Sequence, residues 1–137
     1  MRALQGLMIF FTLFAFTPAA APAEPCDASD SNQADLNECY SKAYKQSDTE
    51  LNAVYRQITA RLKDDPAAAK LLVTAQKAWV AFRDAECSFS TSASAGGSAY
   101  PMMQSICLDG LTVSRVKDLK SYLTCEEGDM SCPVPTQ

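Results

Sequence analysis

All six cysteines of this 137-residue chain lie downstream of an N-terminal segment with the pattern of a cleavable export signal. That segment, residues 1–23, contains Arg2, an apolar run over residues 7–16 and an Ala-Pro-Ala sequence ending at Ala23. Export delivers a small domain to an oxidising compartment, where cysteines form disulfides. The chain is therefore expected to fold around a disulfide framework, and we do not expect metal ligands or catalytic thiols at Cys26, Cys39, Cys87, Cys107, Cys125 and Cys132.

Two other interpretations of the N-terminal segment are disfavoured. The apolar run is about half as long as a segment that crosses a bilayer, so we do not expect a retained membrane anchor. Glu24 and Pro25 stand where lipid attachment at Cys26 would need small residues. We therefore expect a mature protein of residues 24–137 that is periplasmic or secreted and does not insert into a membrane after cleavage.

Charge and composition exclude several classes of function. The chain carries 12 basic and 16 acidic side chains, and loss of Arg2 with the signal brings the net charge to about −5. Such a surface repels nucleic acid and attracts cationic partners. The sequence contains no histidine, which excludes imidazole-based catalytic triads, histidine-ligated zinc and haem attachment. We expect no cofactor.

Apolar and small residues after the first cysteine recur at alternating steps of three and four, which is the period of one helix face. They predict a helix over residues 31–62 with Ser31 as its N-cap, either unbroken or interrupted at residues 46–48. The predicted buried stripe consists of Leu36, Tyr40, Ala43, Ser47, Leu51, Val54, Ile58 and Leu62.

The second predicted helix begins at Pro66, with Asp65 as its N-cap, and ends near Cys87. Residues 88–99 are rich in Ser, Ala and Gly and show no helical period, so they predict a loop. The expected apolar face of this helix comprises Leu72, Ala75, Trp79 and Phe82.

A third helical pattern runs from Pro101 to Leu123, and we expect Gly110 to kink or divide it, with Thr112 capping the second part. No segment alternates with period two. The sequence therefore predicts an all-α fold, a small antiparallel bundle of three to four helices stapled by disulfides. The helical domain is expected to cover residues 24–124, and residues 125–137 to form an irregular tail.

Folding successive helices back about their turns predicts which polar residues meet. Asn52 comes opposite Gln76, Asp48 lies about one turn from Arg83, and Arg115 lies beside the middle of the second helix. We interpret these residues as a structural polar network in which Asp48 neutralises Arg83, and surface recognition is the alternative. The network comprises Asp48, Asn52, Tyr55, Gln76, Arg83, Asp84 and Arg115.

The same folding gathers four cysteines at one end of the bundle, namely Cys26, Cys39, Cys87 and Cys107. Six cysteines allow fifteen pairings, and sequence alone does not select one. Proximity along the chain favours Cys26 with Cys39, Cys87 with Cys107, and Cys125 with Cys132. Exchange of partners among the first four is the competing arrangement.

Several short motifs, taken in order, resemble the LprI-type lysozyme-inhibitor family. They are Asp-Thr-Glu-Leu-Asn-Ala-Val-Tyr at residues 48–55, Gln-Lys-Ala-Trp at 76–79, Phe-Arg-Asp-Ala-Glu-Cys at 82–87, Gly-Gly-Ser at 96–98, Cys-Leu at 107–108 and Leu-Thr-Val-Ser-Arg at 111–115. The resemblance covers residues 26–123 and leaves out Cys125 and Cys132. It implies a small, exported, helical bacterial protein that binds and blocks lysozyme.

If lysozyme is the partner, the serine-rich loop is the segment best suited to enter its cleft. The loop is small, polar and uncharged, and typical lysozymes are basic, so an acidic domain would be steered towards them. The alternative is a solvated, disordered connector that binds nothing. The candidate binding residues are Ser92, Ser94, Gly96, Gly97, Ser98 and Tyr100.

Enzymatic activity and metal binding are both disfavoured, and Trp79 is interpreted as a core residue, with an interface anchor as the alternative. Asp84 and Glu86 are two apart on a helix, so they point about 200° apart and cannot flank one bond. No Cys-x-x-Cys spacing occurs. Two functions therefore remain: a lysozyme inhibitor, or a structural or adaptor domain that binds a cationic envelope protein.

Overall fold

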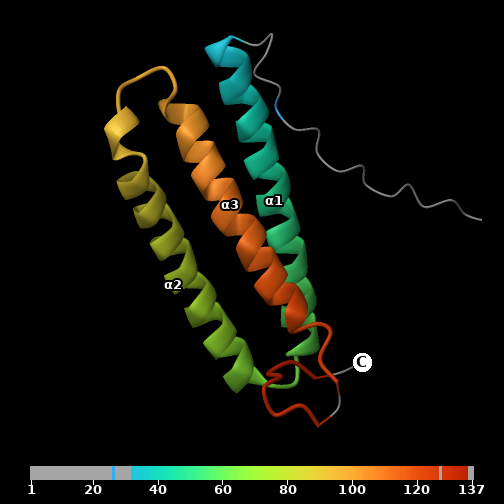
Figure 1. Cartoon of the computed structure of the whole chain (residues 1–137). Coiled ribbons are helices and arrows are strands. Elements are labelled where there is room, and N and C mark those ends of the chain that lie inside the picture. Colours follow the sequence, from blue (N-terminus) through green and yellow to red (C-terminus); the bar gives the residue numbers. More distant parts are fainter. Residues whose placement is uncertain (1–25, 27–31, 127, 136–137) are drawn as a thin grey trace, which may run out of the picture.

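The computed structural model describes Cys26, residues 32–126 and residues 128–135. Within these residues the chain forms three α-helices, α1 (Gln33–Arg61), α2 (Pro66–Ser90) and α3 (Tyr100–Ser121), and a short 3-10 helix, η1 (Ser92–Ser94) (Figure 1). This part of the chain contains no strand. The predicted all-α fold is confirmed, whereas the predicted export signal lies outside the described residues.

Polar side chains cap the first two helices. Asn32 accepts hydrogen bonds from the backbone N–H groups of Ala34 at 2.9 Å and Asp35 at 3.1 Å, so the prediction of Ser31 as N-cap is wrong by one residue. Serine and asparagine cap helices equally well, which is why periodicity alone did not distinguish them. Asp65 caps α2 and Pro66 is its first residue, as predicted.

The first and third helices are both continuous, which confirms the unbroken alternative for α1. α1 continues across residues 46–48, and α3 continues across Gly110, so the predicted division of α3 is wrong. An interior glycine costs a helix only about 1 kcal/mol relative to alanine, and the packing of α3 against α1 outweighs that cost. Thr112 is fully buried and caps nothing.

α3 is the central helix of the bundle (Figure 1). It packs along α1, to which it runs parallel, and it contacts the antiparallel α2 on another side. The prediction that α1 packs directly against α2 therefore holds only at single contacts such as the Arg83–Asp48 ion pair. The apolar stripe of α1 finds larger partners in Val116 and Leu119 of α3 than in the alanine-rich α2.

The apolar core lies where α1 and α3 meet and extends to the end of the chain. The predicted α1 stripe is buried over its second half, at Ser47, Leu51, Val54, Ile58 and Leu62. The sequence did not point to Val134, which is 3% exposed and brings the segment after α3 into the core. The buried apolar cluster consists of Leu51, Val54, Ile58, Leu62, Val116, Leu119 and Val134.

The second helix buries a narrower face than predicted. Leu72 and Trp79 are half-buried and pack against the core cluster. Ala75 and Phe82, which were expected on the same face, are exposed, so their predicted burial is wrong. Because α2 contacts the rest of the bundle mainly through α3, only part of its apolar surface has a partner.

All six cysteines form disulfides, and the pairing favoured by chain proximity is confirmed. Cys26 pairs with Cys39, Cys87 with Cys107, and Cys125 with Cys132. The Cα–Cα distances are 5.9, 5.6 and 5.8 Å, all within the usual range for disulfides. The first two bonds lie towards the end of the bundle where α2 joins α3, and the third closes a loop after α3.

Candidate functional site

The segment that joins α2 to α3, residues 91–99, is a chain of tight turns and not an open loop. The backbone N–H of Ser94 donates to Thr91 O at 3.0 Å, that of Gly97 to Ser94 O at 3.0 Å, and that of Tyr100 to Gly97 O at 3.2 Å. Gly96 adopts a positive φ of 80°, a conformation that glycine accommodates without strain. The α2–α3 connector therefore has a defined backbone shape, unlike the disordered alternative.

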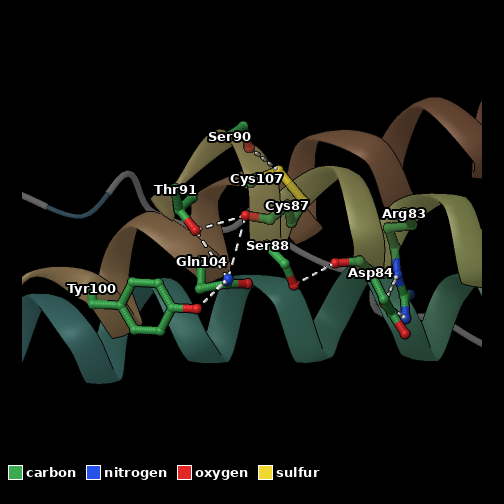
Figure 2. The surroundings of a disulfide bond; sticks show 9 residues. All are labelled: Arg83, Asp84, Cys87, Ser88, Ser90, Thr91, Tyr100, Gln104 and Cys107. Carbon is green, nitrogen blue, oxygen red and sulfur yellow. Dashed lines mark hydrogen bonds and ion pairs between the residues drawn. A yellow bond between two sulfur atoms is a disulfide. The ribbon is translucent and has the colours of Figure 1, made fainter. Parts of the chain in front are cut away.

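Gln104 anchors the base of this connector (Figure 2). Its Nε2 lies within hydrogen-bond distance of the Thr91 hydroxyl at 3.0 Å, the Tyr100 hydroxyl at 2.8 Å and the Cys87 carbonyl at 3.3 Å. The Thr91 hydroxyl is buried and donates to the same Cys87 carbonyl at 2.6 Å. The Cys87–Cys107 disulfide joins α2 to α3 beside this group.

Sequence reasoning missed Gln104 as a functional residue, although a signal was present. Gln104 precedes Cys107 by three positions, so both side chains lie on one face of α3. Because Cys107 must reach Cys87, that face necessarily points towards the end of α2.

The connector also contacts the beginning of α1. Asn37 Nδ2 donates to the backbone carbonyl of Ser98 at 3.0 Å, and beside it Gln33 Nε2 lies 3.7 Å from the sulfur of Met102 in the first turn of α3. These contacts join segments that are more than sixty residues apart in the chain. All three helices therefore hold the connector in place.

The predicted binding residues divide into two groups. Ser94 and Tyr100 are half-buried and make internal hydrogen bonds, Ser94 Oγ donating to Thr91 O at 2.9 Å and Tyr100 Oη accepting from Gln104. The other four face solvent, and all are small and uncharged: Ser92, Gly96, Gly97 and Ser98.

A second group of polar residues surrounds Arg83, whose side chain is only 8% exposed. Its Nη2 lies 2.9 Å from Asp84 Oδ1, and its Nη1 lies 3.6 Å from Asp48 Oδ1 on α1. The guanidinium carbon is 5.2 Å from the centre of the Trp79 ring and 5.6 Å from that of Tyr44. Ion pairing and cation–π contact together compensate the burial of this charge.

Trp79 is shared by two cations. Arg115 on α3 lies 5.9 Å from its ring centre, and Arg115 Nε donates to Gln76 Oε1 at 3.2 Å. The predicted proximity of Arg115 to the middle of α2 is confirmed. Trp79 thus packs against the core cluster while its ring contacts both guanidinium groups.

Two members of the predicted polar network have other contacts than predicted. Asn52 Nδ2 donates to the carboxylate of Asp48 at 3.0 Å on the same helix, so its predicted pairing with Gln76 is wrong. Tyr55 packs against the apolar core. Gln76 instead accepts its hydrogen bond from Arg115 of α3.

Tyr44, beside Arg83, has a pKa above its ordinary value. Burial raises the pKa of the Tyr44 phenol above its ordinary value of 10.0, and the nearby Asp48 and Asp84 carboxylates raise it further. The positive charge of Arg83 opposes this rise. Tyr44 therefore remains a neutral aromatic ring against the guanidinium at physiological pH.

Within the part of the chain that the structure describes, no group of three or more potential ligands is arranged to hold a metal ion. The described helices include none that is long and apolar enough to cross a membrane.

Comparison with known proteins places these features in a family. The chain matches the family described as "Lysozyme inhibitor LprI" over residues 26–119, which is more than half of its length. An uncharacterized protein of Rhizobium meliloti (strain 1021) is 36% identical over 107 residues, covering 70% of this chain and 77% of that protein. No solved structure matches the chain.

Proposed function

This chain belongs to the LprI family of lysozyme inhibitors, and we propose that it is an exported, non-enzymatic protein that binds a lysozyme and occludes its cleft with the α2–α3 connector. The family match supports the partner, and the ordered, uncharged connector supports the mode of binding. Complete disulfide pairing of the six cysteines supports a periplasmic or secreted location.

The main structural support is that the connector is already ordered before it meets a partner. Its turns are closed by backbone hydrogen bonds, and its base is held by Gln104 and by the Cys87–Cys107 disulfide. A segment held in one conformation loses little conformational entropy on docking, so more of its contact energy appears as affinity. The residues proposed to enter the cleft are Ser92, Ser98 and the two intervening glycines.

Charge supports the choice of partner. The whole chain has a formal net charge of −4, and loss of the export signal would make the mature domain more acidic. Opposite charge accelerates the encounter with a basic protein, and this effect weakens as salt screens it. We propose that the acidic surface governs the association rate and that the uncharged connector provides the contact that blocks the cleft.

We assign a structural role to Arg83 and the residues around it. Arg83 is buried and links α2 to α1, so it positions the helices from which the connector extends. A direct contact with the partner would require exposed polar atoms, which Arg83 does not offer. We therefore place the binding residues on the connector and the supporting residues below it.

A lysis assay tests the function. Bacterial cell-wall suspensions are treated with a basic lysozyme at near-physiological salt, with and without a stoichiometric amount of the purified mature protein, and turbidity is followed. Inhibition predicts slower clearing in proportion to the protein added. Clearing at the uninhibited rate would contradict inhibition of that lysozyme. If pull-down under the same conditions still showed binding, the adaptor function would be favoured instead.

A further inference from the structure

α2 carries an exposed apolar stripe along one flank, and Leu71 and Ala75 at its first end border a hollow that Arg115 of α3 also lines. Cys87 bonds to Cys107 of α3, and the stripe lies about half a turn around the helix from Cys87. Leu71 is 71% exposed, Phe82 55% and Phe89 77%, and the three intervening alanines are also exposed. This α2 outer stripe consists of Leu71, Ala75, Ala78, Phe82, Ala85 and Phe89.

The spacing within the stripe is that of a helix-packing seam. Successive members are separated by four, three, four, three and four residues, the repeat that brings side chains into register with a second helix. In Figure 1 α2 forms one edge of the bundle, and no other described segment covers its outer side. A stripe that is this apolar, this regular and this exposed indicates an interface.

Residue sizes favour a second copy of the same helix as the partner. The stripe is symmetric about position 80, so an antiparallel copy would place Phe82 opposite Ala78 and Leu71 opposite Phe89. Each large ring at position 82 would then meet a small residue, and Ala75 would meet Ala85. Alternation of large and small side chains is what allows two helix faces to interdigitate.

The charges beside the stripe favour the same antiparallel orientation. Lys77 and Asp84 lie on the same flank of α2, one on each side of position 80, whereas Glu86 lies on the opposite flank. An antiparallel pair brings Lys77 of one copy beside Asp84 of the other. A parallel pair would bring like charges together, which is unfavourable.

The exposed area is sufficient for a weak but specific dimer. Taking about 200 Å² for a fully exposed large apolar side chain, the three large residues leave roughly 400 Å² exposed per copy. Two copies, with the alanines included, would bury on the order of 1,000 Å², the lower end for specific interfaces. We propose that this protein forms a two-fold symmetric dimer through antiparallel packing of the α2 outer stripe, with a dissociation constant in the micromolar range or above.

The first test measures mass against concentration. Sedimentation equilibrium of the disulfide-intact mature protein should show a monomer that converts to a dimer between about 10 μM and 1 mM. Phe89→Glu should weaken association at least tenfold. Val113→Glu, which changes an exposed apolar residue on α3, should leave it unchanged. Circular dichroism of each variant verifies that the fold is intact.

The second test determines the register. Ala78→Glu and Phe82→Lys should each weaken self-association, because each places a charge against an apolar residue in both halves of the dimer. In an equimolar mixture, the carboxylate introduced at position 78 of one variant would face the ammonium group introduced at position 82 of the other. The remaining Phe82 and Ala78 would meet as they do in the unmodified dimer. The mixture should therefore form a heterodimer more tightly than either variant alone forms a homodimer.

Three results would overturn the proposal: a monomer at all concentrations up to 1 mM, equal disruption by Val113→Glu and Phe89→Glu, or no gain on mixing the two charged variants. A parallel seam would pair position 78 with itself and would give no gain. The readout is mass and not lysozyme inhibition, so this proposal and the proposed function can fail independently.

Discussion

Arg83 on α2 and Asp48 on α1 form an ion pair across the bundle, with Arg83 Nη1 3.6 Å from Asp48 Oδ1. The arginine is buried, while the Asp48 side chain is 41% exposed. The carboxylate therefore retains contact with water, and the guanidinium depends on its neighbours. This asymmetry determines what removal of each partner would cost.

Arg83→Ala should lower the free energy of unfolding by about 2–3 kcal/mol, mainly through lost contacts with Trp79 and Tyr44. The two carboxylates left behind are partly solvated, so their penalty is smaller than for a fully buried pair. Arg83→Met, which keeps the length of the side chain, should cost less. Urea unfolding measures both, and equal losses would show that charge and not packing dominates.

Thr112→Val should raise the free energy of unfolding by about 1 kcal/mol. The Thr112 side chain is fully buried, and its hydroxyl has no hydrogen-bond partner among the described residues. Replacing it with a methyl group of similar shape removes an unsatisfied polar group. Thr112→Ala should instead be destabilising, because it also leaves a cavity. Thermal melts of the two variants should move in opposite directions.

Removing the Cys87–Cys107 disulfide should destabilise the protein and loosen the connector. The bond spans 20 residues, for which loop closure contributes about 3 kcal/mol. In a domain of this size, that loss corresponds to a fall in melting temperature of more than about 10 °C. The double variant Cys87→Ala, Cys107→Ala should show it by calorimetry. An unchanged melting temperature would contradict a stabilising framework.

Ala95→Trp should weaken lysozyme inhibition at least tenfold if the connector enters the cleft. Ala95 is exposed on the connector, so the larger side chain should not disturb folding but should block close approach. Ala60→Trp makes the same change at an exposed position near the opposite end of α1 and serves as the control. Inhibition that is equal for both variants would place the binding site elsewhere.

The raised pKa of Tyr44 predicts a loss of stability in alkaline solution. The contribution of this residue is complete below the ordinary tyrosine pKa of about 10 and disappears as the pH rises through the higher folded-state pKa, because the unfolded chain ionises first. Unfolding in urea at pH 9 and pH 11 measures the loss. Tyr44→Phe should reduce that difference, and an identical difference in both proteins would contradict the assignment.

Patterns within short stretches of the chain were enough to predict the helices, the Asp65 cap with Pro66 and the buried stripe of α1, and chain proximity favoured the cysteine pairing that the structure shows. These features depend on residues close in sequence, through helix periodicity and short loop closure. The Arg83–Asp48 contact also followed from folding one helix back on the next. The alternatives among the cysteines could not be resolved in this way, because fifteen pairings are compatible with the spacing.

Only the tertiary structure decided which helix faces meet. α1 packs along α3, which leaves Phe82 exposed, and α3 is continuous through Gly110. Asn52 and Gln76 bond to Asp48 and Arg115 and not to each other. The tertiary structure also brought Val134 into the core and placed the Gln104 side chain against the connector. A periodic pattern identifies an apolar face but not its partner, because burial depends on the volumes that all elements present to one another. For that reason the helices were predictable from the amino-acid sequence, whereas the exposed stripe on α2 became visible only in the folded protein.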